Sequence, residues 1–472
     1  MIILGTNSIK AAGGYDVDNS LRFNDGSSDS LNKTFGTPSN NKIHTTSVWF
    51  KRSSGLGVNQ SITYVEQGGG YARILLHNSD AIIVDGADSS AGNSYGLTTN
   101  RLFRDVSAWY HIVVAFDDTQ STASDRLKLY VNGVQETSFS SETYPTQNID
   151  YPYNSANAHY IGRNTAGATY YDGYLAEYCF IDGTQNAVTD FGEFDEDSGI
   201  WKPIDVSGLT FGNNGFYLDF ENSGSLGADV SGNGNNFTVN NLTAIDQTTD
   251  TPTNNFATWN PLINTNGVVY SEGNLKANLN ANASWSRGVA SSYAVSQGKW
   301  YWEIKQTSSS TYNINGVVRE DNFGWFTGVS ATYLYNRNMT ALQSTGKTYT
   351  DGTDGSVVSA YAYTTGDILM FALDMTNRKM YIGKNGTWFN SGDPSSGSGE
   401  IFDSSGFTLG YAYSPSFLGY DLGTDPIVEA NFGSPPYAIS SGNTDGNGYG
   451  NFEYAVPSGY YALNTKNLAE YG

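Results

Sequence analysis

One stretch indicates the fold class of this chain most clearly: Trp109-Tyr-His-Ile-Val-Val-Ala-Phe-Asp117, followed by a polar turn and Leu127-Lys-Leu-Tyr-Val-Asn-Gly133. Apolar and polar residues alternate on both sides of the turn, and the Asn-Gly pair marks a second tight reversal, which together predict a β-hairpin. The phrase returns as Asp367-Ile-Leu-Met-Phe-Ala-Leu-Asp374 and Arg378-Lys-Met-Tyr-Ile-Gly-Lys-Asn-Gly386. Two copies this far apart predict two β-sandwiches in tandem.

Length and composition agree with this prediction. A chain of 472 residues is too long for one hydrophobic core, so two or three domains are expected. The chain holds 54 Gly and 34 Tyr, and 14% of its residues are aromatic while only 15% are charged. A disordered chain would lack these aromatics, so the composition predicts a folded, turn-rich, all-β protein.

The charge of the chain is strongly acidic. Lys and Arg total 24 against 46 Asp and Glu, which gives a net charge of −22. Phosphate backbones require basic patches, and none is visible in the sequence, so we expect no direct binding to nucleic acid. The acidic charge does not by itself indicate a function, because an ordinary acidic soluble protein has the same charge balance.

Cysteine content and the N-terminal sequence bear on the compartment. Cys179 is the one cysteine, so no intramolecular disulfide forms, and we expect it to be a small buried hydrophobic residue. Met1-Ile-Ile-Leu-Gly-Thr6 lacks the long apolar run and basic flank of a signal peptide. No stretch approaches the roughly 20 apolar residues of a membrane span. We therefore expect synthesis in a cytoplasm without an export signal and no membrane insertion.

Residues 1–185 contain short strands separated by Gly, Asn and Asp turns, a spacing typical of a sandwich or jelly roll. In this order they resemble the laminin-G-like, concanavalin-A-like jelly roll. The resemblance implies two packed antiparallel sheets, with binding at the loops of one edge or on the concave face. The segments that carry it are Leu21-Arg-Phe-Asn-Asp-Gly26, Ser47-Val-Trp-Phe-Lys51, Trp109-Tyr-His-Ile-Val-Val114, Leu127-Lys-Leu-Tyr-Val-Asn-Gly133, Tyr160-Ile-Gly-Arg163 and Tyr174-Leu-Ala-Glu177.

Residues 186–258 are turn-rich and acidic, with one predicted strand at Gly215-Phe-Tyr-Leu-Asp-Phe220. A flexible linker would not carry so many aromatics, so we interpret the segment as a structured connector whose aromatics pack on neighbouring domains. Three of its parts resemble a connector common in virion proteins of marine bacteriophages. They are Asp190-Phe-Gly-Glu193, Ile200-Trp-Lys-Pro203 and Pro252-Thr-Asn-Asn-Phe256.

Residues 259–472 are predicted to form the second sandwich. Gly298-Lys-Trp-Tyr-Trp-Glu-Ile304 places Trp300, Trp302 and Ile304 on one face of a strand and Tyr301 and Glu303 on the other. The order Trp-Tyr-Trp-Glu, Gly-Val, Leu-Asp-Met-Thr, Tyr-Ile and Asn-Phe-Gly resembles a SPRY (B30.2-like) domain. That resemblance implies a concanavalin-type sandwich that binds protein or peptide partners through loops at one edge.

Glycoside hydrolysis is the enzymatic alternative, since this type of sandwich also carries glucanases. It requires two carboxylates a short distance apart. Glu193, Asp195 and Asp197 come closest, but Asp197 stands where a Glu acid/base is expected, and the segment lies in the connector. A solvated acidic turn is the favoured interpretation. His44, His77, His111 and His159 form no His-Glu-x-x-His pair. We expect a protein that is not an enzyme.

A structural calcium ion is the one cofactor that the sequence raises. Laminin-G-like domains often bind calcium at an edge, and a hard cation requires several converging oxygens. The candidate ligands are Asp117, Asp118 and Asp125, which flank the turn of the first hairpin. Asp is also common in turns that bind nothing.

Aromatic residues in polar loops are the candidate ligand-binding residues. Sugar rings stack on Trp and Tyr while neighbouring amides and carboxylates bind hydroxyl groups. Most aromatics in a chain of this kind are core residues, so the group carries more weight than any one member. The candidates are Tyr170, Tyr171, Trp285, Tyr312, Tyr333, Tyr335 and Tyr349.

These patterns favour a non-enzymatic protein of the virion surface, such as a fibre, spike or capsid appendage. We expect it to adhere to host-surface glycans or envelope proteins through sandwich-edge loops, to contact other virion proteins and to form a homo-oligomer. A purely structural capsid or tail decoration protein is the first alternative. A glycoside hydrolase or depolymerase and a bacterial surface adhesin are the others.

Overall fold

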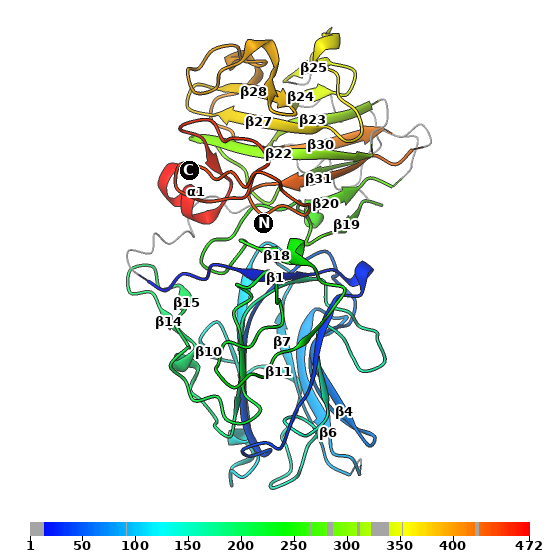
Figure 1. Cartoon of the computed structure of the whole chain (residues 1–472), viewed down its shortest axis with the longest axis vertical. Helices are drawn as coiled ribbons and strands as arrows, with labels where there is room; N and C mark the ends of the chain where they lie inside the picture. The colour runs from blue at the N-terminus through cyan, green and yellow to red at the C-terminus, as the bar shows by residue number, and fades with distance from the viewer. Residues whose placement is uncertain are drawn as a thin grey trace. The chain divides into compact units, whose positions relative to one another are not determined.

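The computed structural model describes residues 14–90, 92–263, 267–280, 287–308, 312–321, 339–351, 353–420 and 424–472. These residues form strands, short 3-10 turns and one α-helix, α1 (Thr465–Tyr471), which confirms the all-β prediction. The chain divides between Thr253 and Asn254 into two compact units. We call them the N-terminal unit and the C-terminal unit and describe each by itself (Figure 1).

The N-terminal unit is a sandwich of two eight-stranded antiparallel sheets (Figure 1). The first, which we call the covered sheet, has the order β10-β9-β8-β3-β13-β1-β18, with β16 paired to β13. Its strands are β1 (Ser20–Phe23), β3 (Ile43–Arg52), β8 (Trp109–Asp117), β9 (Leu127–Val131), β10 (Val134–Gln135), β13 (Gly173–Asp182), β16 (Phe216–Leu218) and β18 (Gln247–Thr248).

The second sheet of this unit, which we call the open sheet, has the order β11-β7-β6-β5-β4-β12-β2-β17. Its strands are β2 (Ser30–Thr34), β4 (Gln60–Gln67), β5 (Gly70–Leu76), β6 (Ala81–Ala87), β7 (Ser94–Leu102), β11 (Phe139–Thr143), β12 (Ala158–Ile161) and β17 (Thr238–Asn240).

The hairpin predicted from residues 109–133 is confirmed. Strands β8 and β9 pair antiparallel with Val114 opposite Leu129. The following reversal places Asn132 at φ 47° and Gly133 at φ 78°, between the paired residues Val131 and Val134. Two successive left-handed residues define a turn that matches the twist of antiparallel strands, and Asn and Gly are the residues that adopt it. Asn385 and Gly386 repeat this turn in the C-terminal unit.

The main core of the N-terminal unit lies between its two sheets. Val48 and Phe50 of β3 point inward, as do Ile82 and Val84 of β6, and all are buried. Each such side chain contributes about 1.5–3 kcal/mol by leaving water. Ile83 and Asp85, which alternate with the inward residues of β6, are half-buried on the other face.

Of the segment predicted to be a connector, residues 186–258, residues 186–253 belong to the N-terminal unit and residues 254–258 to the C-terminal unit. Its strands extend both sheets, since β16 and β18 join the covered sheet and β17 joins the open sheet. Phe216, Phe220 and Phe237 enter the main core. The hairpin β14 (Gly192–Phe194) and β15 (Trp201–Pro203) forms a separate ladder.

The same segment buries the outer face of the covered sheet. Val113, Cys179 and Ile181 point away from the main core and pack against a second cluster of Phe191, Val206, Phe211 and Tyr217. A third cluster contains Val17, Trp49, Ala176 and Trp201. All ten residues of β13 are consequently buried. Cys179 is a buried, free cysteine.

A chain of hydrogen bonds ties the β14–β15 hairpin to the covered sheet. The Trp201 indole N–H donates to His111 Nδ1 over 2.9 Å, and His111 Nε2 lies 2.8 Å from Ser47 Oγ. Because an indole only donates, Nδ1 must accept, so His111 is neutral and carries its proton on Nε2. Burial lowers the pKa of His111 to about 3.

A buried ion pair ties the end of the segment to the same sheet. Lys51 Nζ lies 2.7 Å from Asp250 Oδ2, and both side chains are 1% exposed. The Trp109 indole N–H donates to the other carboxylate oxygen over 3.0 Å. Satisfying both carboxylate oxygens in this way is what makes a buried charge pair tolerable.

The C-terminal unit is a second sandwich (Figure 1). One sheet has the order β19-β20-β31-β22-β27-β28-β29, with β32 on β22, and the other has the order β21-β30-β23-β24-β25-β26. Their strands are β19 (Val269–Ser271), β20 (Lys276–Asn278), β21 (Arg287–Ala290), β22 (Lys299–Ser308), β23 (Tyr312–Arg319), β24 (Met339–Gln343), β25 (Lys347–Thr350), β26 (Thr353–Val357), β27 (Ile368–Asp374), β28 (Lys379–Lys384), β29 (Thr387–Trp388), β30 (Tyr413–Tyr420), β31 (Ile427–Asn431) and β32 (Tyr461–Ala462).

The predicted two-sided strand is β22. Trp300, Trp302 and Ile304 are buried in the core between the sheets. Glu303, on the other face, accepts hydrogen bonds from the backbone N–H groups of Glu453 and Tyr454, and from the Tyr301 hydroxyl. Burial raises the pKa of Glu303 to about 7, against the lowering effect of these donors. Glu303 therefore fastens residues of the C-terminal segment over this sheet.

Replacing Trp201 with Phe tests the hydrogen-bond chain. The ring is retained, but the buried Nδ1 of His111 loses its donor, which we expect to cost about 1–3 kcal/mol in the unfolding free energy of the N-terminal unit. Urea denaturation measures this cost, and hydrogen–deuterium exchange should quicken in residues 192–203. Trp388→Phe in the C-terminal unit is the matched control, and equal exchange in the two variants contradicts the assignment.

Replacing His44 with Phe tests whether buried neutral histidines set the acid sensitivity of the N-terminal unit. Burial lowers the pKa of His44 to about 3, its ring stacks on Phe116 at 4.7 Å, and its Nδ1 has no hydrogen-bond partner. Below pH 6.5 the His44 side chain is protonated in the unfolded chain but stays neutral in the folded protein. The stability that neutral His44 contributes to the folded state is therefore lost as pH falls.

The stability of His44→Phe relative to the parent protein should therefore rise by about 1.4 kcal/mol per pH unit below pH 6.5. Urea denaturation at several pH values measures this difference. Glu177 and Asp118, whose pKa values burial raises to about 7 and about 6, titrate in both proteins and cancel in it. A difference that does not change with pH contradicts the prediction.

Candidate functional site

The outer face of the open sheet carries a row of residues that crosses all eight of its strands. The antiparallel register places Tyr160 opposite Tyr64, Tyr64 opposite Arg73, and Arg73 opposite Asp85. Asn32 and Thr238 continue the row on one side, and Gly96 and Thr143 continue it on the other. We call these eight residues the cross-strand row.

None of the eight residues in the cross-strand row is buried. Strands in a sheet lie about 4.8 Å apart, so the row is roughly 34 Å long. The inward neighbours Val65, Ala72, Ile74 and Val84 are all buried. The period-two alternation of these strands therefore separates a core face from a polar and aromatic outer face.

Aromatic rings are concentrated at the centre of this face. Tyr71, which lies beside the row on β5, is parallel to Tyr64, with ring centroids 6.4 Å apart and an interplanar angle of 10°. The Arg73 guanidinium lies 5.1 Å from the Tyr71 centroid, and Arg163 lies 4.5 Å from the Tyr160 centroid. Stacked cations hold the two rings in defined orientations.

A paired charge lies next to the rings. Arg73 donates two hydrogen bonds to Asp85, over 2.7 and 2.9 Å, and the Tyr71 hydroxyl donates to Asp85 over 3.1 Å. Burial opposes the charged form of Arg73, but the bonds to Asp85 outweigh it and raise the pKa. Burial, and then the nearby carboxylates, raise the pKa values of Tyr64 and Tyr71, so both phenols remain protonated at neutral pH.

This arrangement has the two components of a sugar-binding surface. The half-exposed rings of Tyr64, Tyr71 and Tyr160 offer flat apolar area on which the C–H faces of a sugar can stack. Arg73 and Asp85 offer hydrogen-bond donors and acceptors at fixed positions beside them.

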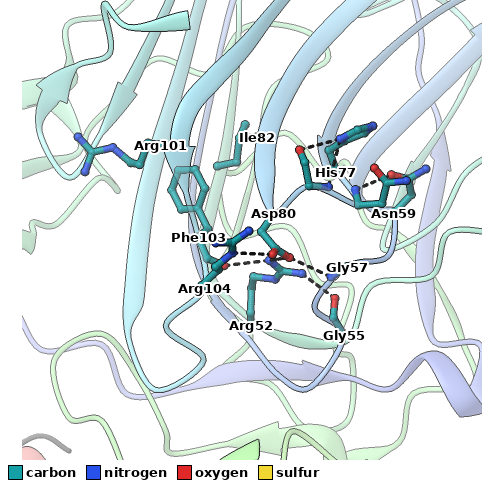
Figure 2. A network of polar contacts seen from close by, with 12 residues as sticks. Arg52, Gly55, Gly57, Asn59, His77, Asp80, Ile82, Arg101, Phe103 and Arg104 are labelled. Carbon is teal, nitrogen blue, oxygen red and sulfur yellow. Dashed lines mark hydrogen bonds and ion pairs between the residues drawn. The ribbon is translucent and has the colours of Figure 1, made fainter. Parts of the chain in front are cut away.

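The loops at one end of the same sandwich are fixed by Asp80 (Figure 2). Asp80 is buried, with φ 67°, and accepts hydrogen bonds from Arg52 Nη1, Arg104 Nε and the Gly57 backbone N–H over 2.9–3.1 Å. Arg52, which is fully buried, also donates to the carbonyl groups of Phe103 and Gly55.

Asp80 therefore joins the loops after β3, β5 and β7. Burial alone would raise its pKa, but hydrogen bonds from Arg104, Gly57 and Arg52 outweigh burial and lower it. Around this centre, His77 bonds to Ser79 and the Asn78 N–H bonds to Asn59 on the surface (Figure 2). Asp80 and the groups around it thus give this end of the sandwich a polar, hydrogen-bonded edge (Figure 2).

The predicted loop aromatics fall into three groups. Tyr170 and Tyr312 are half-buried. Trp285, Tyr333 and Tyr335 lie outside the described residues. The expectation of an open loop position is wrong for Tyr171 and Tyr349, which are 0% and 3% exposed. The Tyr171 hydroxyl donates to the carbonyl groups of Lys51 and Tyr174, and the Tyr349 hydroxyl lies 3.4 Å from Gln343 Oε1, so both are core residues.

The predicted calcium ligands do not form a metal site. Asp117 accepts hydrogen bonds from Thr119 and Gln120 in its own turn, Asp118 accepts one from the Ile149 backbone, and Asp125 pairs with Lys128 at 3.0 Å. Within the described ranges no three His, Cys, Asp or Glu side chains are arranged to hold a metal ion. These residues therefore do not fit the calcium site that the resemblance implied.

The acidic run of the connector lies on the β14–β15 hairpin. Lys202 Nζ lies 3.3 Å from Glu193 and 3.2 Å from Asp195, and Asp195 also accepts hydrogen bonds from Ser198. The hydrogen bonds from Ser198, followed by those from Lys202, lower the pKa of Asp195 to about 2. Asp195 is thereby held in its charged form, whereas a general acid requires a carboxyl group that stays protonated.

The prediction missed Tyr64, Tyr71 and Tyr160, because it looked for ligand-binding residues in loops. A signal was present in the alternation of Thr63-Tyr-Val-Glu66 and Tyr71-Ala-Arg-Ile74, where every second residue is aromatic or charged. That alternation shows which residues of each strand face outward. It does not show that the strands pair in a register that places these residues side by side.

Comparison with known proteins agrees with a lectin-like fold in the N-terminal unit. Residues 20–187 match the family model of the Concanavalin A-like lectin/glucanases superfamily. No curated protein matches the chain. In the part of the chain that the structure describes, no helix has the length and apolar character needed to cross a membrane.

Solved structures with a similar arrangement include the SPRY domain of human HERC1, at 16% identity and a TM-score of 0.29, covering 36% of this chain and 96% of that one. The heptameric SAP-like pentraxin from Limulus polyphemus gives 13% identity and a TM-score of 0.27, covering 37% and 80%. The PSpry domain of TRIM65 gives 12% identity and a TM-score of 0.27, and the match covers 37% of this chain and 91% of that one.

Replacing Asp80 with Asn tests the loop-fixing centre. The change keeps the size of the side chain but leaves the buried Arg52 without its counter-charge, which should cost about 3–5 kcal/mol in unfolding free energy. Asp125→Asn, at an exposed ion pair, is the matched control and should change stability by less than about 1 kcal/mol. Urea denaturation measures both, and equal effects contradict the role of Asp80.

Proposed function

We propose that the N-terminal unit binds glycans on the outer face of its open sheet. Tyr64, Tyr71 and Tyr160 stack against sugar rings, while Arg73 and Asp85 form hydrogen bonds with their hydroxyl groups. The observation that carries the proposal is the cross-strand row, which aligns these groups across the sheet without burying any of them.

The two sheets of this unit differ in a way that supports this location. The outer face of the covered sheet is occupied by residues 186–253, whereas the central strands of the open sheet present half-exposed tyrosines. The length of the row favours a chain of several sugars over a single one. An extended ligand on an open face gains affinity from repeated weak contacts.

The proposed activity is binding without catalysis. Asp85 accepts hydrogen bonds from Arg73 and Tyr71, so both of its carboxylate oxygens are already engaged. A glycosidase requires a second carboxyl group that remains protonated beside it.

The biological role that we propose is adhesion of a virion to its host surface. The resemblance of the connector to those of marine bacteriophage virion proteins supports this role, as does the acidic, lectin-like character of the chain. Contacts with other virion proteins and homo-oligomeric assembly belong to the same proposal. Many copies on one particle would turn weak single sites into firm attachment.

Glycan binding by the full chain and its variants tests the proposal. Tyr64→Ala and Tyr160→Ala should each weaken binding to a host envelope glycan array by roughly ten-fold, because each removes one stacking surface. Circular dichroism should be unchanged. Tyr170→Ala is the matched control on a loop and should bind as the parent protein does.

Each contrary result points elsewhere. Loss of binding in Tyr170→Ala alone would move the site to the edge loops. Binding to no glycan or cell would favour a structural decoration protein. Release of reducing ends from any glycan would overturn the non-enzymatic assignment.

A further inference from the structure

A groove in the C-terminal unit holds a second arrangement of stacked tyrosines. It has a volume of about 400 Å³, within the range of small-ligand pockets, and Tyr461, Tyr471, Lys299, Thr376 and Glu470 line it. Tyr461 is on β32 and Tyr471 ends α1. Their ring centroids are 3.8 Å apart with an interplanar angle of 8°, so the rings stack face to face and each covers one face of the other.

The stack is held by buried polar contacts. Asn467 of α1 is fully buried and donates to Asp445 over 2.7 Å and to the Ala462 carbonyl over 2.9 Å. Asp445 also accepts the backbone N–H of Ala462 over 2.9 Å. The helix and β32 are therefore fixed to the same carboxylate, which sets the distance between the two tyrosines.

The backbone beside the stack is shaped to leave room for it. Gly298 has φ 80°, and a Cβ atom there would lie 2.6 Å from the Tyr471 carbonyl oxygen and 3.0 Å from the Trp300 ring. Any other residue would push α1 away from β22. Close packing of Tyr471 at this position therefore depends on glycine.

The polar groups of the groove indicate an uncharged ligand. Lys299 lies 3.1 Å from the buried Asp374, so its charge is already neutralised. Glu470 and Thr376 are exposed at the rim and offer a carboxylate and a hydroxyl group. An anion such as a phosphate would meet a paired cation and an unpaired carboxylate, whereas the hydroxyl groups of a neutral sugar find donors and acceptors.

We propose that this groove binds one neutral sugar unit, packed against the Tyr461–Tyr471 pair and hydrogen-bonded by Lys299, Thr376 and Glu470. It is a second site, independent of the cross-strand row and located on the other unit. The two sites would allow one chain to hold two parts of a glycan or two neighbouring glycans, which raises avidity.

Saturation-transfer NMR on the full chain with a panel of free neutral monosaccharides tests the groove. Tyr471→Ala removes half of the stack, and Thr376→Arg fills the groove from an exposed turn while leaving both tyrosines in place. Both should lower the affinity for the bound sugar by roughly ten-fold or more. Leu409→Ala, at an exposed side chain of the C-terminal unit outside both proposed sites, is the matched control and should leave this signal unchanged. Tyr64→Ala, measured alongside, reports the contribution of the open sheet.

The variants also separate this proposal from the first. If Tyr64→Ala removes the signal and Thr376→Arg does not, the sugar binds only to the open sheet, and the groove assignment is wrong. A sugar signal that neither groove variant changes, or no signal from any sugar in the panel, also overturns it. If the Thr376→Arg variant loses the sugar signal and keeps a normal circular dichroism spectrum, the groove assignment is supported even if the Tyr471→Ala variant unfolds.

Discussion

The structure of the N-terminal unit depends on how residues 186–253 cover one of its two sheets. A β-sandwich normally buries one face of each sheet and leaves the other in water. Here β3, β8 and β13 carry apolar side chains on both faces, and Trp201, Phe211 and Tyr217 supply the second layer. Without that layer, Trp49, Val113 and Ile181 would face solvent.

Two buried polar contacts determine where that layer attaches. Trp201 reaches Ser47 through a neutral His111, and Asp250 pairs with Lys51. Apolar packing alone is tolerant of position, whereas a buried donor or charge requires one particular partner. Glu303 acts in the same way in the C-terminal unit, where it receives the backbone of Glu453 and Tyr454. Each unit thus uses a buried polar group to place a covering segment.

Covering one sheet has a consequence for function. The sheet that remains open keeps the alternation of buried apolar and half-exposed polar residues, and its outer face is where rings and charges are accessible. Tyr64, Tyr71, Arg73 and Asp85 come from three consecutive strands, so local hairpins align them, while Tyr160 is brought in by β12 from far along the chain. The stacked tyrosines of the C-terminal groove likewise come from a strand and a helix.

Local sequence patterns predict the all-β class, the two hairpins, the Asn-Gly turns and the two faces of β22, because these features follow from residue periods and turn preferences over a few neighbouring positions. Which aromatic side chains face solvent follows from the tertiary structure and not from such local patterns. Tyr171 and Tyr349 lie in Gly- and Thr-rich surroundings yet are buried, whereas Tyr64 and Tyr160 lie on strands and are half-exposed. Exposure depends on strand register and on covering segments that join residues far apart in sequence, such as Tyr64 with Tyr160 and His111 with Trp201, and no local pattern encodes those pairings.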